Sequence, residues 1–357
     1  MNQEIQAVKD QAVDQEILVT KRDGSKESID FEKIHRVVHW ASQDLENISV
    51  SQVEINAQLA FFDGIKTEDI HETIIKSAAD LISTDVPDYQ YLAARLAIFH
   101  LRKKAFKSFT PPSLIDHVTK LTNLGIYDKD ILNKYNTSEF EEFNNYIDHW
   151  RDMNFSYAAV KQLVGKYLVQ NRVTGEIRES PQMLYMLVGM CLFQEYKGKA
   201  RIKIVKRFYD ASSNFKISLP TPIMAGVRTP TRQFSSCVLI ETDDDLDSIS
   251  AASGAIVKYV SQRAGIGINA GKIRALGSPI RGGEATHTGC IPFFKHFHTA
   301  VKSCSQGGVR GGAATLFYPL WHLEVEGLIV LKNNTVNIVD RAEDIKPFFR
   351  KTGNMIF

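Results

Sequence analysis

The sequence predicts a mixed fold in which a helical first part precedes an α/β part with a parallel sheet. Three observations support this. After one short hairpin signal, apolar side chains recur at helical spacing as far as about residue 215. Beyond Ile217, short apolar runs alternate with helical stretches that are joined by glycine loops. Strands that alternate with helices favour parallel α/β architecture.

The composition is that of an ordinary globular chain with room for two or three domains. Of 357 residues, 44% are hydrophobic and 24% charged, and 43 basic against 41 acidic side chains leave a net charge of +2. This balance indicates neither a nucleic-acid nor a membrane surface. The polar leader, 1–17, lacks the apolar stretch of a signal peptide, and the apolar run 183–193 is too short for a membrane span. Four cysteines without paired spacing favour a reducing cytoplasm.

Residues 18–106 predict a compact module of one hairpin and four helices. Two strand-like runs between Leu18 and Ile29 flank Asp23-Gly24, a hairpin turn signal. Asp30 is placed to cap the first helix. The other helices are expected over about 51–62, from Thr67, and from Asp88 to the basic residues 102–104.

Pro111-Pro112 marks a boundary, and a helical domain is expected over 107–215. Its helices are expected at 114–124, 139–150, 158–168 and in the apolar run ending at Phe193. In the α/β part, strands are expected at 237–241, 265–270, 315–320 and 327–331, and helices at 246–263 and 291–304.

Cys237 is the first candidate for chemistry. A cysteine ahead of an apolar strand is most often an inert core residue. Two serines precede Cys237, however, and place it at a loop-to-strand junction, where a thiol is accessible enough to react. Cys191 lies within an apolar helical run and is expected in the core.

The glycine-rich segments match no common phosphate-binding motif. Gly265–Gly271 has GxGxxxG spacing instead of the GxGxxG of a dinucleotide fold, and 303–313 lacks the GK[ST] of a Walker A loop. A rival metal hypothesis combines His287, Cys290, His296 and His298. Their spacing fits no common structural zinc site, and Pro292 begins a helix between them, so no metal ligand is assigned.

Several strings resemble the large (α) subunit of class I ribonucleotide reductase. They are SLPTPIMAGVRTPTRQFSSCVLIETDDDLDSI, GIGINAGKIRALGSPIRGGE and SCSQGGVRGGAATLF. The first module resembles the ATP-cone regulatory domain on VTKRDGS, GIKTEDIHETII and YQYLAARLAIFHLRKK. The resemblance implies an ATP cone at 18–106, a helical domain at 107–215, the first half of a ten-stranded α/β barrel at 216–334 and a divergent tail at 335–357.

The resemblance also implies four groups of site residues. Cys237 would be one of two cysteines that reduce the substrate, with Thr221, Ser236 and Gly265 binding that substrate. An allosteric activity site for ATP or dATP would comprise Lys21, Glu27, Lys33, Thr67, Asp69, His71, His100 and Lys103. A specificity site for effectors would comprise Asp244, Asp245, Leu246, Arg274 and Arg281. A mobile loop at 303–313 would link effector to substrate through Cys304, Gln306 and Arg310.

The implied activity is the reduction of ribonucleoside diphosphates to deoxyribonucleoside diphosphates. In the family the radical cysteine and the second redox cysteine lie beyond the position of Asn334, so this chain is expected to be inactive alone and to need a complementary fragment. Other implied protein partners are a diiron-tyrosyl small (β) subunit that supplies the radical, and thioredoxin or glutaredoxin. The chain is also expected to self-associate together with its complementary fragment. Nucleotides with magnesium are the implied ligands, and no further cofactor is expected. The alternative is a non-catalytic, nucleotide-binding regulatory fragment.

Overall fold

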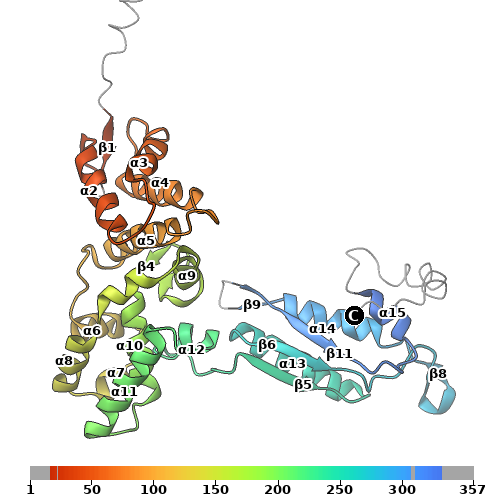
Figure 1. Ribbon diagram of the computed structural model, residues 1–357. Coiled ribbons are helices and arrows are strands. Elements are labelled where there is room, and N and C mark those ends of the chain that lie inside the picture. The colour runs from red at the N-terminus through yellow and green to blue at the C-terminus, as the bar shows by residue number, and fades with distance from the viewer. Residues whose placement is uncertain (1–16, 22, 307–309, 332–357) are drawn as a thin grey trace, which may run out of the picture. The chain divides into compact units, whose positions relative to one another are not determined.

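A computed structural model describes residues 17–21, 23–306 and 310–331 (Figure 1). Residues 1–16 of the leader and all of the tail, 335–357, lie outside these ranges. The chain divides into two compact units: the first extends to Leu219 and includes Ile223–Pro230, while the second contains Pro220–Pro222 and the described residues from Thr231 onward. None of the helices in these ranges is both long and apolar enough to cross a bilayer.

The first unit begins with the predicted hairpin, which is confirmed. Strands β1 (Leu18–Thr20) and β2 (Lys26–Ser28) pair antiparallel. Gly24 lies in the turn at φ +85°, a conformation that glycine adopts without a steric penalty. The adjoining backbone closes the turn through the Lys21 N–H, which donates to the Ser25 carbonyl at 2.8 Å.

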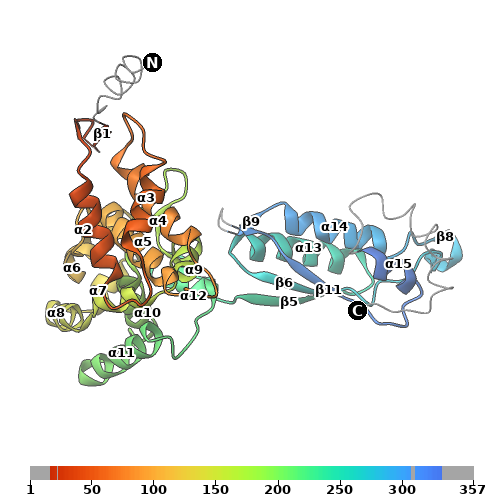
Figure 2. The same cartoon turned by 45° about the horizontal axis from the view of Figure 1, so that its top comes forward.

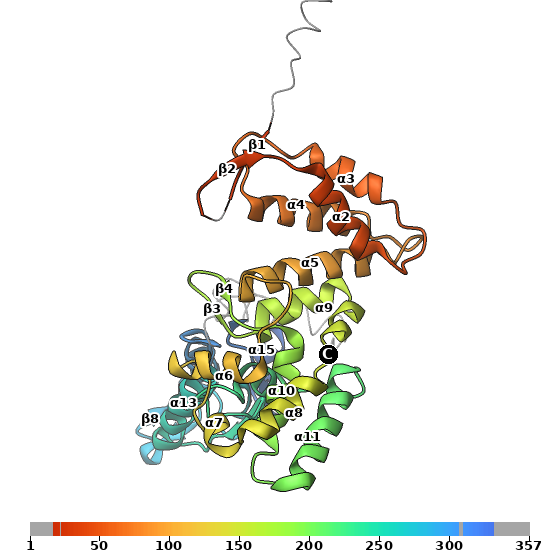
Figure 3. The same cartoon turned by 90° about the vertical axis from the view of Figure 1, so that its left-hand side faces the viewer.

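Four helices complete this module: α2 (Phe31–Ser42), α3 (Val50–Gln58), α4 (Thr67–Asp80) and α5 (Tyr89–Phe106). The Asp30 side chain caps α2 by accepting the Lys33 N–H at 3.0 Å, as predicted. Helix α3 ends four residues before the predicted Phe62, and Asp88 accepts the Glu46 N–H instead of capping α5. Helix α5 packs against α4 on one side and the helical domain on the other (Figure 3).

The helical domain follows α5 in the same unit. Its elements are α6 (Leu114–Asn123), α7 (Asp130–Lys134), α8 (Thr137–Tyr146), a 3-10 helix (His149–Asn154), α9 (Tyr157–Gln162), a π-helical turn (Leu163–Tyr167), β3 (Gln170–Asn171) and β4 (Glu176–Ile177), α10 (Pro181–Leu192) and α11 (Gly198–Ser213). Helix α10 is buried almost throughout and forms the centre of the apolar core. Cys191 packs against that core, as expected.

Buried ion pairs lie within the helical domain and at its junction with the first module. The side chains of Arg228 and Glu179 are both fully buried and form one pair, and the Tyr127 hydroxyl also donates to Glu179 at 2.5 Å. Arg102 at the end of α5 pairs with buried Asp152 at 2.7 Å and so joins the first module to this domain. Removing one partner from such a pair leaves an uncompensated buried charge, which is strongly destabilising.

The second unit is built on the predicted parallel sheet, which confirms the α/β assignment. Strand β6 (Gly265–Asn269) lies between β5 (Cys237–Glu241) and β11 (Ala314–Phe317), and all three are parallel. Helices α13 (Leu246–Ser261) and α14 (Ile291–Lys302) lie on one side of this sheet (Figure 2). Two hairpins complete this unit: β7 (Pro279–Ile280) with β8 (Ala285–Thr286), joined by a short 3-10 turn at Arg281–Gly283, and β9 (Ser305–Gln306) with β10 (Arg310–Gly311). Helix α12 (Thr221–Gly226) begins in this unit, and its residues from Ile223 onward belong to the first unit.

The sheet is covered on one face only among the described residues. Ile266 and Ile268 are buried against the helices. On the other face, Leu239 is 81% exposed and Phe317 is 50% exposed. Parallel sheets are normally buried on both faces, so this face is suited to further protein structure.

One predicted strand is wrong. The run at 327–331 belongs to helix α15 (Val325–Val330) and not to a strand. Leu328 and Leu331, three residues apart on one side of a helix, both pack on the core of the second unit. A five-residue apolar run has no periodicity that separates a buried strand from a buried helical turn, and only packing decides between them.

Candidate functional site

A cavity of about 640 Å³ lies in the first module between the β1–β2 hairpin, α2, the start of α4 and the end of α5. It brings together six of the eight residues expected for an activity site: Lys21, Glu27, Lys33, Thr67, His71 and Lys103. These residues are up to 82 positions apart in the sequence, and the packing of α5 against α2 and α4 makes them neighbours.

The rim of this cavity is charged. Lys21 pairs with Glu27 at 2.5 Å, and Lys33 pairs with Asp30 at 3.3 Å. The hydrogen bond that the Lys21 ammonium donates to the Glu27 carboxylate raises the pKa of Lys21, so its ammonium keeps its charge. Arg36 and Lys103 add two further cations. Cations already held by exposed carboxylates can exchange those partners for an anionic ligand.

The floor of the cavity is apolar and aromatic. Ile70, Ile74 and Leu96 line it together with Phe99. The Phe99 ring lies 5.6 Å from the His71 ring, and the Lys103 ammonium lies 5.7 Å from the Phe99 centroid. Cations at the rim above a flat aromatic floor suit a ligand with phosphates at one end and a heterocycle at the other.

Asp69 and His100 lie on a different cavity. That cavity, of about 510 Å³, also includes Glu72 and Lys104 and reaches Tyr157 in the helical domain. Helical geometry explains the difference, because Phe99 and Lys103 are four residues apart and share one face of α5, whereas His100 is turned away. Phe99 and Arg36 are among the cavity residues that the sequence analysis did not select. The four-residue spacing from Lys103 is the signal that points to Phe99.

Cys237, Ser236 and Gly265 meet at the amino ends of β5 and β6. Cys237 is exposed, and its register partner is Gly265. The Ser236 hydroxyl lies 3.7 Å from the Cys237 sulfur, and the Ser236 carbonyl accepts the Gly265 N–H at 2.8 Å. A side chain at Gly265 would begin 3.8 Å from that sulfur, so the glycine leaves the thiol open. Thr221 begins α12 in the same compact unit.

Four of the five residues expected at the specificity site follow the carboxyl ends of β5 and β6, and the fifth, Arg281, follows β7. Asp244 holds Arg274 at 2.6 Å, and Asp245 caps α13 by accepting the Ser248 N–H at 2.8 Å. Leu246 is 70% exposed at the first position of that helix. Arg281 follows β7 at φ +51°, an uncommon conformation for a residue with a side chain.

The 303–313 segment returns to the Cys237 end of the sheet. The Ala313 carbonyl accepts the N–H of Ile266, beside Gly265, at 3.2 Å. Cys304 packs against the core, while β9 and β10 pair antiparallel so that Gln306 lies opposite Arg310. The side chains of Gln306 and Arg310, and residues 307–309, lie outside the described part of the chain.

The two ends of the sheet are therefore chemically distinct. The thiol and the end of the 303–313 segment lie at the amino end, and the Asp244–Arg274 pair lies at the carboxyl end.

Three protein-family models match successive parts of this chain. Residues 17–104 match the ATP cone domain, 153–232 the all-alpha domain of ribonucleotide reductase, and 235–348 its barrel domain. The chain belongs to the class I ribonucleotide reductase large-subunit family.

Individual large subunits of ribonucleotide reductase are similar over the same region. The chain is 73% identical over 322 residues to ribonucleoside-diphosphate reductase 1 subunit alpha of Escherichia coli, which is 90% of this chain and 42% of that protein. It is 53% identical over 320 residues to the alpha subunit of enterobacteria phage T4, and 31% identical over 331 residues to that of Helicobacter pylori. These matches cover 89% and 93% of this chain and 42% and 41% of the two relatives, so the chain spans well under half the length of these reductase subunits.

The rival zinc set does not converge. His296 and His298 are exposed on α14, and His287 stacks on Phe293 at 5.7 Å. Within the described ranges Cys290 instead meets His322 and Glu324, two residues that the sequence analysis did not select. They follow β11 and lie far from Cys290 in sequence, so spacing gave no signal for this cluster.

Proposed function

We propose that the chain is the effector-binding and substrate-binding part of a ribonucleoside-diphosphate reductase large subunit. In this proposal the cone cavity binds ATP or dATP with magnesium, and the Asp244–Arg274 end of the sheet binds a deoxyribonucleoside triphosphate effector. The opposite end receives the diphosphate substrate through Thr221, Ser236 and Gly265. The observation that carries the proposal is the exposed Cys237 thiol between Ser236 and Gly265 at the strand ends.

Reduction of the substrate takes two electrons and two protons, which a pair of thiols supplies as it becomes a disulfide while the 2′ hydroxyl leaves as water. Cys237 provides one of these thiols. The other cysteines in the described part are partly or fully buried and are not paired with it. The second thiol and the radical cysteine would therefore come from polypeptide beyond this region, and the radical from a diiron-tyrosyl small subunit.

The uncovered face of the sheet supports the need for a complementary polypeptide. Leu239 and Phe317 present apolar surface there, and β5 and β11 are the edges of the described sheet. An apolar face with open strand edges is unfavourable in water and is stabilised by pairing with further strands. Thioredoxin or glutaredoxin would then reduce the disulfide between turnovers.

The test is CDP reduction by four assemblies, each with the small subunit and a dithiol reductant. The chain alone is expected to give no product, and the chain with a polypeptide that carries the remainder of a large subunit is expected to give repeated turnover. In that complete assembly Cys237→Ser abolishes repeated turnover. Cys191→Ala, in the helical core, keeps it and serves as the matched control.

A non-catalytic regulatory fragment is the second candidate, and the cone cavity favours it because nucleotide sensing requires only that module. One result would support it over the reductase proposal: ATP binding by the chain without any gain of CDP reduction when the remainder of a large subunit is added. Wild-type turnover by the Cys237→Ser assembly would show instead that Cys237 is not one of the reducing thiols.

A further inference from the structure

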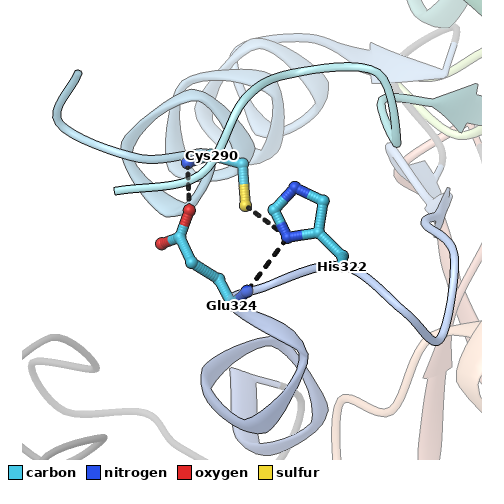
Figure 4. Close-up of side chains that lie close together, drawn as sticks. All are labelled: Cys290, His322 and Glu324. Atoms are coloured by element: carbon cyan, nitrogen blue, oxygen red, sulfur yellow. Dashed lines mark hydrogen bonds between the residues drawn. The ribbon is translucent and has the colours of Figure 1, made fainter. Parts of the chain in front are cut away.

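A cluster of three side chains joins the loop after β6, the start of α14 and the turn after β11 (Figure 4). Its members are Cys290, His322 and Glu324. The Glu324 carboxylate accepts the N–H of Cys290 at 2.8 Å and that of Leu276 at 3.1 Å. One carboxylate oxygen thus connects two segments that are 34 and 48 positions away in the sequence.

His322 connects the same loop through its ring. Its Nε2 lies 2.9 Å from the Ile273 carbonyl, which can only accept, so Nε2 carries the proton. Nδ1 is then an acceptor, and it receives the Glu324 N–H at 3.1 Å. The Cys290 sulfur faces the same Nδ1 at 4.0 Å.

The cluster is closely packed. Gly289 has φ +91°, and a Cβ there would lie 2.6 Å from one Glu324 carboxylate oxygen and 2.8 Å from the other. Burial, and then Glu324, raise the pKa of the Cys290 thiol, which keeps it neutral. The single lone pair of His322 Nδ1 already accepts a backbone N–H. Hydrogen bonds therefore account for this cluster without a metal ion.

The cluster lies near the carboxyl end of the sheet, and helix α14 connects it to the amino end. Ile273 and Leu276 flank Arg274 in the loop that carries the proposed effector contact. Cys290 precedes α14, whose 12 residues span about 18 Å toward the Cys237 end. There, Gly312 packs so closely on the Val301 carbonyl of α14 that a Cβ would lie 2.2 Å from it, and the Lys302 ammonium donates to the Gly312 carbonyl at 3.2 Å.

We propose that His322 and Glu324 are positioning residues that transmit effector binding from the Arg274 loop to α14 and so to the 303–313 segment. This inference rests on the proposed effector site at Asp244 and Arg274. An effector that moves Ile273 and Leu276 must move Glu324, and Glu324 also holds the first turn of α14. A rigid helix carries that displacement to Gly312, beside the proposed substrate site.

The test uses the full chain with dTTP as the effector probe. Equilibrium dialysis gives the affinity, and amide hydrogen exchange gives the protection of 272–281 and of 302–306. In the wild-type chain, dTTP is expected to slow exchange in both segments. Glu324→Ala is expected to remove the protection of 302–306 and to weaken dTTP binding about fivefold or more, because the Leu276 N–H in the effector loop loses its hydrogen bond to a charged carboxylate.

Two further variants make the result specific. Glu326→Ala, an exposed change two residues farther on, keeps wild-type affinity and protection. His322→Gln, which loses the contact to Ile273 but keeps Glu324, reduces the protection of 302–306 and replaces Glu324→Ala if that variant does not fold. Wild-type affinity and protection in Glu324→Ala, or in His322→Gln where it replaces that variant, would overturn the inference.

Two other outcomes also decide against it. Absence of dTTP binding to the wild-type chain would overturn the proposed effector site and this inference together. Retention of one zinc per chain after gel filtration, lost in Cys290→Ala and in Glu324→Ala, would show that the cluster is a metal site instead of a hydrogen-bonded connection.

Discussion

Lys103→Ala is the sharpest test of the cone cavity. Lys103 lies on the face of α5 that lines the cavity, beside Phe99, and its ammonium would meet the phosphates of a bound nucleotide. A hydrogen bond to a charged group contributes about 1.5–3 kcal/mol, which corresponds to roughly 10- to 150-fold in affinity. Lys21 and Lys33 also line the cavity and still attract the anion in the variant, so the lower part of this range, about 10- to 30-fold, is expected.

The neighbouring lysine provides a matched control. Lys104 contacts Glu68 and lies 3.6 Å from Glu72, and it lines the second cavity instead of the first. Lys104→Ala makes the same change in charge and in helix propensity, yet it is expected to change the affinity for ATP by less than about twofold.

Titration calorimetry of the full chain with magnesium and ATP measures both variants, and hydrogen exchange of 97–106 locates the binding. Thermal unfolding checks that both variants are folded. Equal losses in the two variants would show that only net charge matters, and an unchanged affinity in Lys103→Ala would remove Lys103 from the site. Either result refutes the reasoning from the geometry of α5.

Three other changes test the remaining structure. In the complete assembly, Arg281→Ala is expected to alter the preference among the four substrates more than the rate with the best one, and a uniform loss of rate in parallel CDP, UDP, ADP and GDP assays would contradict this. Glu179→Ala leaves the buried Arg228 without its carboxylate and is expected to lower the free energy of urea unfolding by about 3–5 kcal/mol. Its control is Glu176→Ala, which removes the more exposed pair with Arg178 and is expected to change that free energy by less than about 1 kcal/mol. Burial lowers the pKa of His117 and His149 from 6.5 to about 4, so the unfolded chain binds protons between these values that the folded chain does not. Their contribution to stability is complete above about pH 6.5 and is lost as the pH falls toward 4, by about 1.4 kcal/mol per pH unit per group at most. His117→Gln is expected to reduce the dependence of the free energy of urea unfolding on pH over that range. An unchanged pH dependence in this variant would exclude His117 as a cause.

The sequence by itself determined most of the local elements and the family. Asp30 as a helix cap, the turn at Asp23-Gly24 and the parallel strand at Cys237–Glu241 were predictable because capping, turn formation and strand periodicity depend on nearby residues. The motifs around Cys237 and in the cone were long enough to identify a ribonucleotide reductase large subunit.

The tertiary structure decided which faces meet. It separated His100 from Phe99 and Lys103, because one residue along α5 turns a side chain by about 100°. It made the apolar run at 327–331 a helix, because Leu328 and Leu331 pack on one core. It also joined Cys290 to His322 and Glu324 through contacts across more than 30 positions. Local sequence preferences set each element, but such long-range contacts form only when several elements pack together, and no local pattern encodes that packing.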